Sequence, residues 1–558
     1  MANIASLRVP APPVAEPPPQ APASPRTYRR RRRIATGLAL AIVALAIALP
    51  AILFGSGSTS APATGAAALV PADALAYVHL STDHGRPALS QSTALEHRLP
   101  ELTALANSLN GRLTAILGGG SQLDYARDIK PWLGREAALA LLDTTSTTAG
   151  SELVLDVRDA AKARALLARA GASVTGRYRG VAIESYPTGT ELAFVKHYLV
   201  LGQDASVRAA IDVAGGAARS LAASSDYRAA TTGEPSDRVL DAYASAAGMR
   251  RLLGGASGAL GALGTLLAQP AATGTSVTLS PASGGMRVRI HSALDPSLLR
   301  LSGRRAQFTA ALPRLLPSGS MLLLDTARLD RAAPRLLGAL GTLGIAGGVQ
   351  PLLDRLGKAL VAQGVNVQKV LSLLDGEAAI GLTPSTTGAG PAPVIVARTS
   401  QPALARQTLA ELEVPLEQLF PTPASGPGLQ TEWNDVQAGG ETVHQLAVAP
   451  GLQLDYAVFD GLVVVSTTPD AIASIAHHAR ALSSDSAYRA AVGDQPARVT
   501  SLLFFDFSQL LSLAEQTGLT SSARFGAIGP DLARIHAVGL SSTAGETDTT
   551  AELFLQIS

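Results

Sequence analysis

The sequence predicts an α+β fold built as a tandem duplication of two antiparallel-sheet domains with helices packed on the sheets. One observation is that short apolar strands, joined by turn residues, alternate with single helices, a pattern typical of antiparallel sheets. The other is that three segments recur in the same order on both sides of residue 300, with separations of 246, 241 and 261 residues. The three pairs are Leu69–Val78 with Leu315–Leu324, Glu136–Leu139 with Glu377–Ile380, and Ser225–Ala230 with Ser486–Ala491.

An apolar segment at residues 34–54 precedes the repeats. It contains no charged side chain, and 21 residues at roughly 1.5 Å each span about 31 Å, close to the thickness of a bilayer's hydrocarbon core. Five arginines, Arg29 to Arg33, stand directly before it, and basic flanks stay on the cytoplasmic side. The segment predicts a single-pass cell-membrane protein with a cytoplasmic N-terminus and an extracytoplasmic bulk. A cleaved signal peptide ending near Ala61-Pro62-Ala63 is the alternative.

These features divide the chain into five parts. Residues 1–33 form a Pro-rich basic cytoplasmic tail, predicted to be disordered, whose Pro17-Pro18-Pro19 run reads as a spacer rather than an SH3 ligand. Residues 34–54 form the transmembrane helix, and residues 55–68 a flexible Gly/Ser/Ala/Thr linker. Residues 69–302 and 303–558 form the first and second extracytoplasmic α+β repeats.

Composition excludes several function classes. Seven arginines and one glutamate lie in residues 1–33, so the remainder carries 38 basic against 42 acidic residues, a net charge of −4. A mildly acidic chain with 4% aromatic residues is a poor match for nucleic acid, which favours basic surfaces and stacking rings. The absence of cysteine excludes disulfides, thiolate metal sites and a thiol nucleophile.

The elements of the first repeat follow from period-two apolar runs and from capping residues. Asp159 stands where it can cap a helix. The predicted strands cover residues 74–80, 136–142, 153–157, 181–186, 192–201, 275–280 and 286–291, and the predicted helices cover 91–117, 160–170 and 205–213.

The second repeat predicts the same succession. Asp460-Gly461 is a tight-turn signal between apolar runs, and Ser400 with Pro402 marks a helix start. The predicted strands cover residues 321–326, 377–382, 394–397, 443–448, 454–465, 499–505, 535–541 and 550–556, and the predicted helices cover 329–374, 402–413 and 469–479. We expect the helices of each repeat to pack on one face of its sheet.

After a membrane segment and a short linker, the chain carries three characteristic runs: Pro71-Ala72-Asp73-Ala74-Leu75-Ala76-Tyr77-Val78, Asp460-Gly461-Leu462-Val463-Val464 and Ser486-Ala487-Tyr488-Arg489. With this arrangement, residues 34–558 resemble a bacterial membrane-anchored family catalogued as domain of unknown function 3352. The resemblance implies an extracytoplasmic envelope protein. It brings no established activity, substrate or catalytic residue.

Chemistry-bearing motifs are few. His79, Asp83 and His84 could supply metal ligands, but the positions 246 residues later are Asp325, Leu329 and Asp330. Because the second repeat keeps no imidazole, we predict no metal site. Neither a G-x-S-x-G elbow nor a G-x-x-x-x-G-K-[ST] phosphate loop is present. We therefore predict a protein that is not an enzyme and that needs no cofactor.

The repeated Tyr-Arg dipeptides are the candidate ligand-binding residues shared by both repeats: Tyr227, Arg228, Tyr488 and Arg489. A guanidinium can bind an anion or a carboxylate. The alternative is a helix turn in which Tyr fills the core and Arg caps carbonyl groups.

A glycine-rich stretch, Leu252–Ala268, is the remaining unusual feature. Small residues at short spacing make a smooth helix that could line a lipid cavity, with Leu266 and Leu267 as contacts, or pack closely on another helix. The sequence thus predicts a non-catalytic binding or scaffolding module of the cell envelope, with a carrier or sensor of a lipid or other apolar molecule as the alternative. Its expected partners are the membrane through residues 34–54 and an envelope protein or lipid, and no nucleic acid.

Overall fold

The computed structural model describes residues 61–83, 85–88, 123–142, 150–253, 270–302, 306–328, 361, 374–385, 390–419, 432–449, 452–477, 480–516 and 532–557. Within these ranges, twenty strands form one sheet. Every neighbouring pair is antiparallel. The predicted α+β class is confirmed. The expectation of two separate sheets is wrong, because the two sets of strands are joined edge to edge.

In its described residues, the first half contains ten strands and several short helices. The strands are β1 (Ala76–Ser81), β2 (Leu133–Leu142), β3 (Gly150–Val157), β4 (Ser173–Tyr178), β5 (Val181–Ser185), β6 (Glu191–Val195), β7 (Tyr198–Gly202), β8 (Leu240–Ser245), β9 (Ala272–Ala282) and β10 (Gly285–Leu294). The helices are η2 (Gly65–Ala68), η3 (Tyr125–Ile129), α4 (Ala160–Arg169), α5 (Asp204–Ala214), η4 (Leu221–Ala223), α6 (Ser225–Ala230), α7 (Ala246–Leu253) and α9 (Pro296–Ser302).

The second half contains ten further strands. They are β11 (Leu322–Ala327), β12 (Glu377–Thr383), β13 (Ala392–Arg398), β14 (Trp433–Ala438), β15 (Glu441–Ala449), β16 (Leu452–Phe459), β17 (Leu462–Ser466), β18 (Ser501–Asp506), β19 (Ile535–Ala544) and β20 (Asp548–Ile557). The helices are η5 (Leu312–Arg314), α13 (Pro402–Leu419), α14 (Pro469–Ala476), η6 (Leu482–Ser484), α15 (Ser486–Val492) and α16 (Phe507–Gln516).

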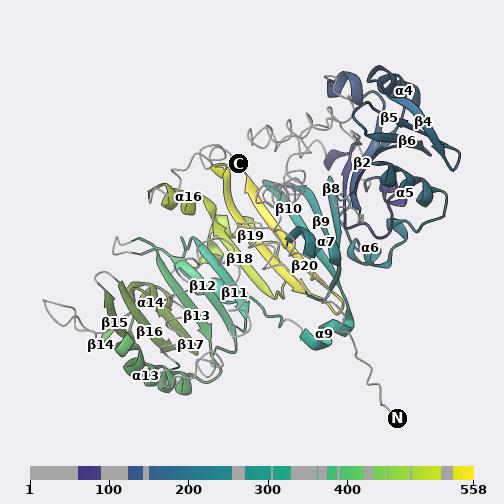
Figure 1. Ribbon diagram of the computed structural model, residues 1–558. Helices are drawn as coiled ribbons and strands as arrows, with labels where there is room; N and C mark the ends of the chain where they lie inside the picture. Colours follow the sequence, from purple (N-terminus) through teal and green to yellow (C-terminus); the bar gives the residue numbers. More distant parts are fainter. Residues whose placement is uncertain are drawn as a thin grey trace, which may run out of the picture.

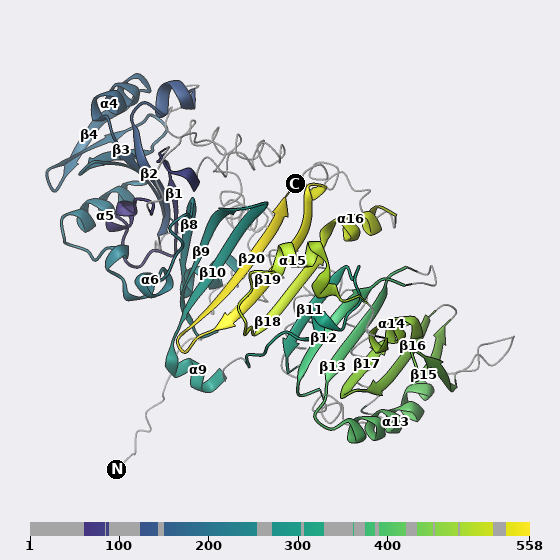
Figure 2. The same cartoon turned by 180° about the vertical axis from the view of Figure 1, so that it is seen from behind.

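The order of strands across the sheet reads the same from either edge (Figures 1 and 2). From the first edge it runs β4-β5-β6-β7-β3-β2-β1-β8-β9-β10. From the other edge it runs β14-β15-β16-β17-β13-β12-β11-β18-β19-β20. The two runs meet where β10 pairs with β20, and we call this pair the seam.

The seam has a symmetric register. Gly285 lies opposite Gln556 at one end and Ala293 lies opposite Asp548 at the other, with Arg289 opposite Glu552 at the centre. The strand pairings also show which residues of the two halves occupy corresponding positions across the sheet. His79 pairs with Ala138 and Asp241, whereas Asp325 pairs with Ala379 and Leu502. The separations of these positions, 246, 241 and 261 residues, equal those of the recurring segments in the sequence.

Helices lie on both faces of the sheet, so the expectation of helices on one face is wrong. Val154 and Leu155 are consecutive and point to opposite faces. Val154 packs in a core that includes Ile211 of α5, and Leu155 packs in a second core that includes Leu166 of α4. Buried apolar residues on each side of β3 therefore need cover on each side.

Two long predicted strands are each divided by a turn. Residues 192–201 split into β6 and β7 at Lys196, whose φ of 55° lies in the left-handed region. Residues 454–465 split into β16 and β17 at Asp460-Gly461, with φ values of 47° and 71°, so the tight turn predicted there is confirmed. Asp159 caps α4 as predicted, because its side chain accepts a hydrogen bond from the Lys162 N–H.

The folded part of the first half begins before residue 69. Residues Gly65–Ala68, assigned by sequence to the flexible linker, form η2, and Ala66 and Ala67 are buried in the core. The predicted membrane segment 34–54 and the predicted helices 91–117 and 329–374 lie outside the described residues, apart from Val361 and Leu374. Among the residues that are described, no helix is both long and apolar enough to cross a membrane.

Candidate functional site

The repeated tyrosines are core residues. Tyr227 lies on α6 and is 8% exposed, and Tyr488 lies on α15 and is 5% exposed. The Tyr227 ring meets the edge of Tyr243 at 5.2 Å between centroids, and Tyr488 meets Phe504 at the same distance. Each tyrosine thereby fixes a short helix against the sheet.

The adjacent arginines point outward. Arg228 is exposed, and its Nε lies 3.4 Å from the Ser224 carbonyl oxygen, to which it donates. Arg489 is exposed at the corresponding place on α15. The two arginines lie on different helices, one in each half of the sheet. Leu266 and Leu267, the predicted lipid contacts, lie outside the described residues.

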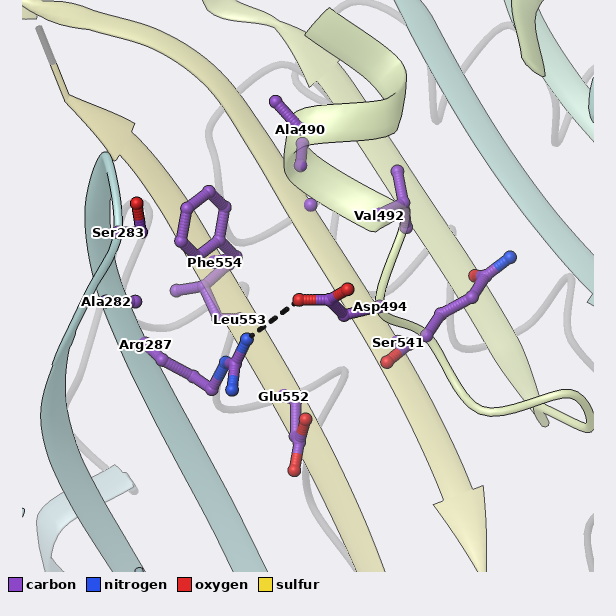
Figure 3. Close-up of a pocket in the computed structure, with 13 residues that line it drawn as sticks. Ala282, Ser283, Arg287, Ala490, Val492, Asp494, Ser541, Glu552, Leu553 and Phe554 are labelled. Atoms are coloured by element: carbon purple, nitrogen blue, oxygen red, sulfur yellow. Dashed lines mark hydrogen bonds and ion pairs between the residues drawn. The ribbon is translucent and has the colours of Figure 1, made fainter. Parts of the chain in front are cut away.

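A cavity of about 140 Å³ lies between α15, which packs on β19, and the seam (Figure 3). The helix contributes Ala490, Ala491 and Val492 to the wall, directly after Tyr488 and Arg489. The strands and the chain following α15 contribute the remainder: Ala282, Ser283, Arg287, Asp494, Gln495, Gly539, Ser541, Glu552, Leu553 and Phe554. One copy of the Tyr-Arg helix thus forms part of a hollow that both halves line.

The cavity combines charged, polar and aromatic groups. Arg287 Nη2 lies 3.4 Å from Asp494 Oδ2, as the dashed line in Figure 3 shows. Glu552 Oε1 lies 3.9 Å from Arg289 Nε of the neighbouring strand. Gln495 Oε1 is buried without a hydrogen-bond partner. The hollow therefore offers carboxylate and amide oxygens beside the Phe554 ring.

A second polar group is enclosed within the first half. His79 Nδ1 lies 2.9 Å from Asp241 Oδ1, and His79 Nε2 lies 3.3 Å from Glu136 Oε2. Arg238 Nε lies 3.0 Å from the same Asp241 oxygen and 3.2 Å from Glu234 Oε2. We call these five residues the His79 cluster.

Charge pairing sets the protonation of this cluster. Burial alone would lower the pKa of His79, but Asp241 and Glu136 outweigh it and raise the pKa from 6.5 to about 9. Burial raises the pKa of Glu234 to about 7, with a further contribution from Asp241. Each ring nitrogen of His79 faces a carboxylate oxygen, so the imidazolium is committed to internal ion pairs rather than to a substrate.

Glu136 also holds the start of the fold. Its carboxylate oxygens accept the N–H groups of Gly65 and Ala66 at 3.0 and 3.2 Å, and Tyr198 donates its hydroxyl to Oε1 at 2.6 Å. Glu377 repeats this cap by accepting the N–H groups of Ala311 and Leu312 at 2.5 and 2.8 Å. The recurring Glu-Ala-Ala segment is therefore explained by helix capping.

The sequence did not single out Glu136, Asp241 or Arg238 as members of a polar cluster. The signal for Glu136 was its recurrence as Glu377, and the signal for Arg238 was its i,i+4 spacing from Glu234. Asp241 carried no local signal, because it lies 162 residues from His79. No group of three or more metal-ligating side chains with suitable geometry occurs in the described ranges.

Comparison with known proteins gives a family and a weak structural likeness. No curated protein matches the chain. Crystal forms III and I of TP0453 align over 44% and 43% of this chain and 88% and 85% of that one, both at 10% identity, with TM-scores of 0.24 and 0.25. The sequence model of the family described as "Protein of unknown function (DUF3352)" matches residues 35–557. The chain belongs to the DUF3352 family.

Proposed function

We propose that the protein is a non-catalytic binding or scaffolding module of the cell envelope, held at the membrane by residues 34–54. The observation that carries the proposal is the seam cavity, where both halves contribute polar side chains to one surface hollow. The His79 cluster, by contrast, is buried, and its charged groups pair with one another. A sheet with an open hollow at its centre suits recognition of a ligand or partner.

We also propose that the two halves arose by tandem duplication. The palindromic order of strands supports this. Each strand pairing within the first half has a counterpart within the second, and the seam pairs the corresponding strands β10 and β20. The equivalent caps of Glu136 and Glu377 give further support. The seam then joins the last strand of one copy to the last strand of the other.

The membrane topology can be tested by thiol labelling, because the chain has no cysteine of its own. We expect Ser58→Cys, in the linker, to react with a membrane-impermeant maleimide in intact cells. Ser24→Cys, in the tail, is the matched control and should react only after lysis. The reverse pattern would overturn the orientation, and loss of the Ser24→Cys label from the mature protein would favour a cleaved signal peptide.

A carrier of a lipid or other apolar molecule is the second candidate, favoured by the glycine-rich Leu252–Ala268. The test is native mass spectrometry of the extracytoplasmic portion, released from the purified full chain at a protease site placed within residues 55–60. A stoichiometric lipid that disappears in Leu266→Asp/Leu267→Asp without unfolding would favour the carrier. A bare polypeptide mass favours the binding or scaffolding module.

A further inference from the structure

The seam cavity has a counterpart in the first half that is already occupied. The strand registers relate β10 to β20 and β9 to β19 by 263 residues, so Arg289 corresponds to Glu552 and Thr278 to Ser541. The 261-residue relation between α6 and α15 makes Gly233 and Glu234 correspond to Asp494 and Gln495. Each half therefore has the same set of backbone positions around the end of its Tyr-Arg helix.

In the first half, the Arg289 guanidinium lies in this place. Its Nη1 donates to the carbonyl oxygen of Gly233, just beyond the end of α6. Both of its terminal nitrogens lie within 4 Å of the point where a Cβ on Gly233 would stand, at 3.7 and 3.8 Å. The protein thus contains its own example of how this arrangement receives a guanidinium.

In the second half, the corresponding residue is Glu552, and the space is the cavity of about 140 Å³. The exchange of Arg for Glu removes a donor and adds an acceptor at the same position. Asp494 adds a second carboxylate, and Gln495 Oε1 is an acceptor without a partner. Among the described residues that line the cavity, Arg287 is the cation, and it pairs with Asp494. Arg289 of the neighbouring strand faces Glu552 at 3.9 Å, beyond hydrogen-bond distance.

We propose that the seam cavity binds a guanidinium group. The proposal rests on the proposed binding function and names the chemistry of its ligand. The guanidinium takes the place in the second half that Arg289 takes in the first, and it donates to the Glu552 carboxylate and the carbonyl groups after α15. Planar guanidinium donors match carboxylates in this way, and aromatic faces such as Phe554 accept them.

The test uses the full chain in lipid nanodiscs and N-acetyl-arginine methylamide as the probe, with binding measured by isothermal titration calorimetry. The N-acetyl-citrulline derivative is the matched control, since it has nearly the same shape but no charge. We expect Glu552→Gln to weaken binding of the arginine probe by roughly tenfold, the loss of one charge-assisted hydrogen bond. Equal binding of the two probes would overturn the proposal.

Two further variants exploit the correspondence between the halves. Glu552→Arg should fill the cavity and abolish binding. Arg289→Ala should empty the first-half counterpart and also remove the cation that faces Glu552, so the stoichiometry should rise from one guanidinium to two. Circular dichroism and the unfolding midpoint establish that each variant folds. Unchanged affinity in a folded Glu552→Arg would overturn the proposal.

The source of the guanidinium is resolved by comparing the small probe with an arginine-containing decapeptide. Binding of the peptide more than tenfold tighter indicates the side chain of a protein partner, and equal affinity indicates a free small molecule. These measurements use purified protein and do not depend on membrane topology. Failure of guanidinium binding is therefore distinguishable from failure of the envelope-anchoring proposal.

Discussion

The two halves of the sheet keep one buried carboxylate in common and pair it differently. Glu136 and Glu377 each cap the 3-10 helix that opens their half. In the first half the neighbouring position holds His79, an imidazolium between Glu136 and Asp241. In the second half it holds Asp325, whose pKa is raised to about 9 by burial and by the adjacent Glu377. The backbone requirement is constant, whereas the cation that accompanies it in the first half is replaced by a neutral carboxyl group in the second.

This difference shows how a buried cap can be neutralised in two ways. The first half uses ion pairs: His79 lies between the two carboxylates, and Arg238 forms a further ion pair with Asp241. The second half pairs Glu377 with Arg398, whose Nε lies 3.3 Å from Glu377 Oε2, and keeps the Asp325 carboxyl group neutral at pH 7 because its pKa is raised. Leu502 stands where Asp241 would be, so the second half lacks this carboxylate. The two solutions predict different responses to mutation and to pH.

Removing the cap carboxylate should produce the largest effect, and an unequal one. Glu136→Ala leaves the His79 charge short of a partner in a closed core, which we expect to lower the free energy of unfolding by about 3–5 kcal/mol. Glu377→Ala leaves a neutral Asp325, loses the two cap bonds and removes the ion-pair partner of Arg398, a partly exposed guanidinium that water can solvate, so we expect about 1–3 kcal/mol. Urea denaturation compares the two variants.

The two tryptophans allow each half to be followed alone. Trp132 lies in the core of the first half and Trp433 lies on β14 of the second, and the chain has no others. Fluorescence in a Trp433→Phe background reports the first half, and fluorescence in a Trp132→Phe background reports the second. Equal losses of unfolding free energy for Glu136→Ala and Glu377→Ala would contradict the prediction, because they would show that the two buried carboxylates contribute equally to stability.

The pH dependence of the unfolding free energy should also differ between the two halves, by a smaller amount than the cap substitutions. The pKa of Asp325 is raised from 3.8 to about 9, so its contribution is complete below pH 3.8 and is lost as the pH rises from 3.8 through 9. The pKa of His79 is raised from 6.5 to about 9, so its contribution is complete below pH 6.5 and is lost from 6.5 through 9. Between pH 4.5 and 6, only the Asp325 contribution falls.

Variant subtraction isolates these two groups from other buried acids, such as Glu152, whose pKa burial raises to about 8. The stability difference between the parent and Asp325→Asn should decline steadily from pH 4.5 upward. The difference between the parent and His79→Gln should not decline until the pH exceeds 6.5. A decline of the His79 difference already at pH 5 would mean that the imidazole is not held as the cation between its carboxylates.

The sequence predicted most strands because half-buried strands alternate and end at turn residues. It did not predict β4 (Ser173–Tyr178) or β14 (Trp433–Ala438), the two edge strands. β4 has five exposed positions and one partly exposed position, so no apolar alternation marks it. It also missed β8, although the strand is buried at five of six positions, because it follows a charged turn at Asp237 and Arg238.

The seam and the clusters could not be predicted for a related reason. Alternation along β10 and β20 indicates that each is a strand, but it carries no information on which distant strand lies beside it. His79 was noticed beside Asp83, its neighbour in sequence, whereas its partners Glu136 and Asp241 reach it across the ladders of β2 and β8. Pairing between residues far apart in sequence is decided by the packing of the whole sheet.

The smallest effects should come from the Tyr-Arg arginines, and here the halves should agree. Arg228 and Arg489 are exposed, and Arg228 donates a long hydrogen bond of 3.4 Å to a helix carbonyl. We expect Arg228→Ala and Arg489→Ala each to change the free energy of unfolding by less than about 0.5 kcal/mol, the usual range for surface substitutions. Denaturation with and without 50 mM phosphate is the measurement, with Arg→Lys at each position as the control. If phosphate stabilises the parent but not the alanine variants, the arginines bind an anion, and the shared dipeptide then serves recognition as well as the folding of α6 and α15.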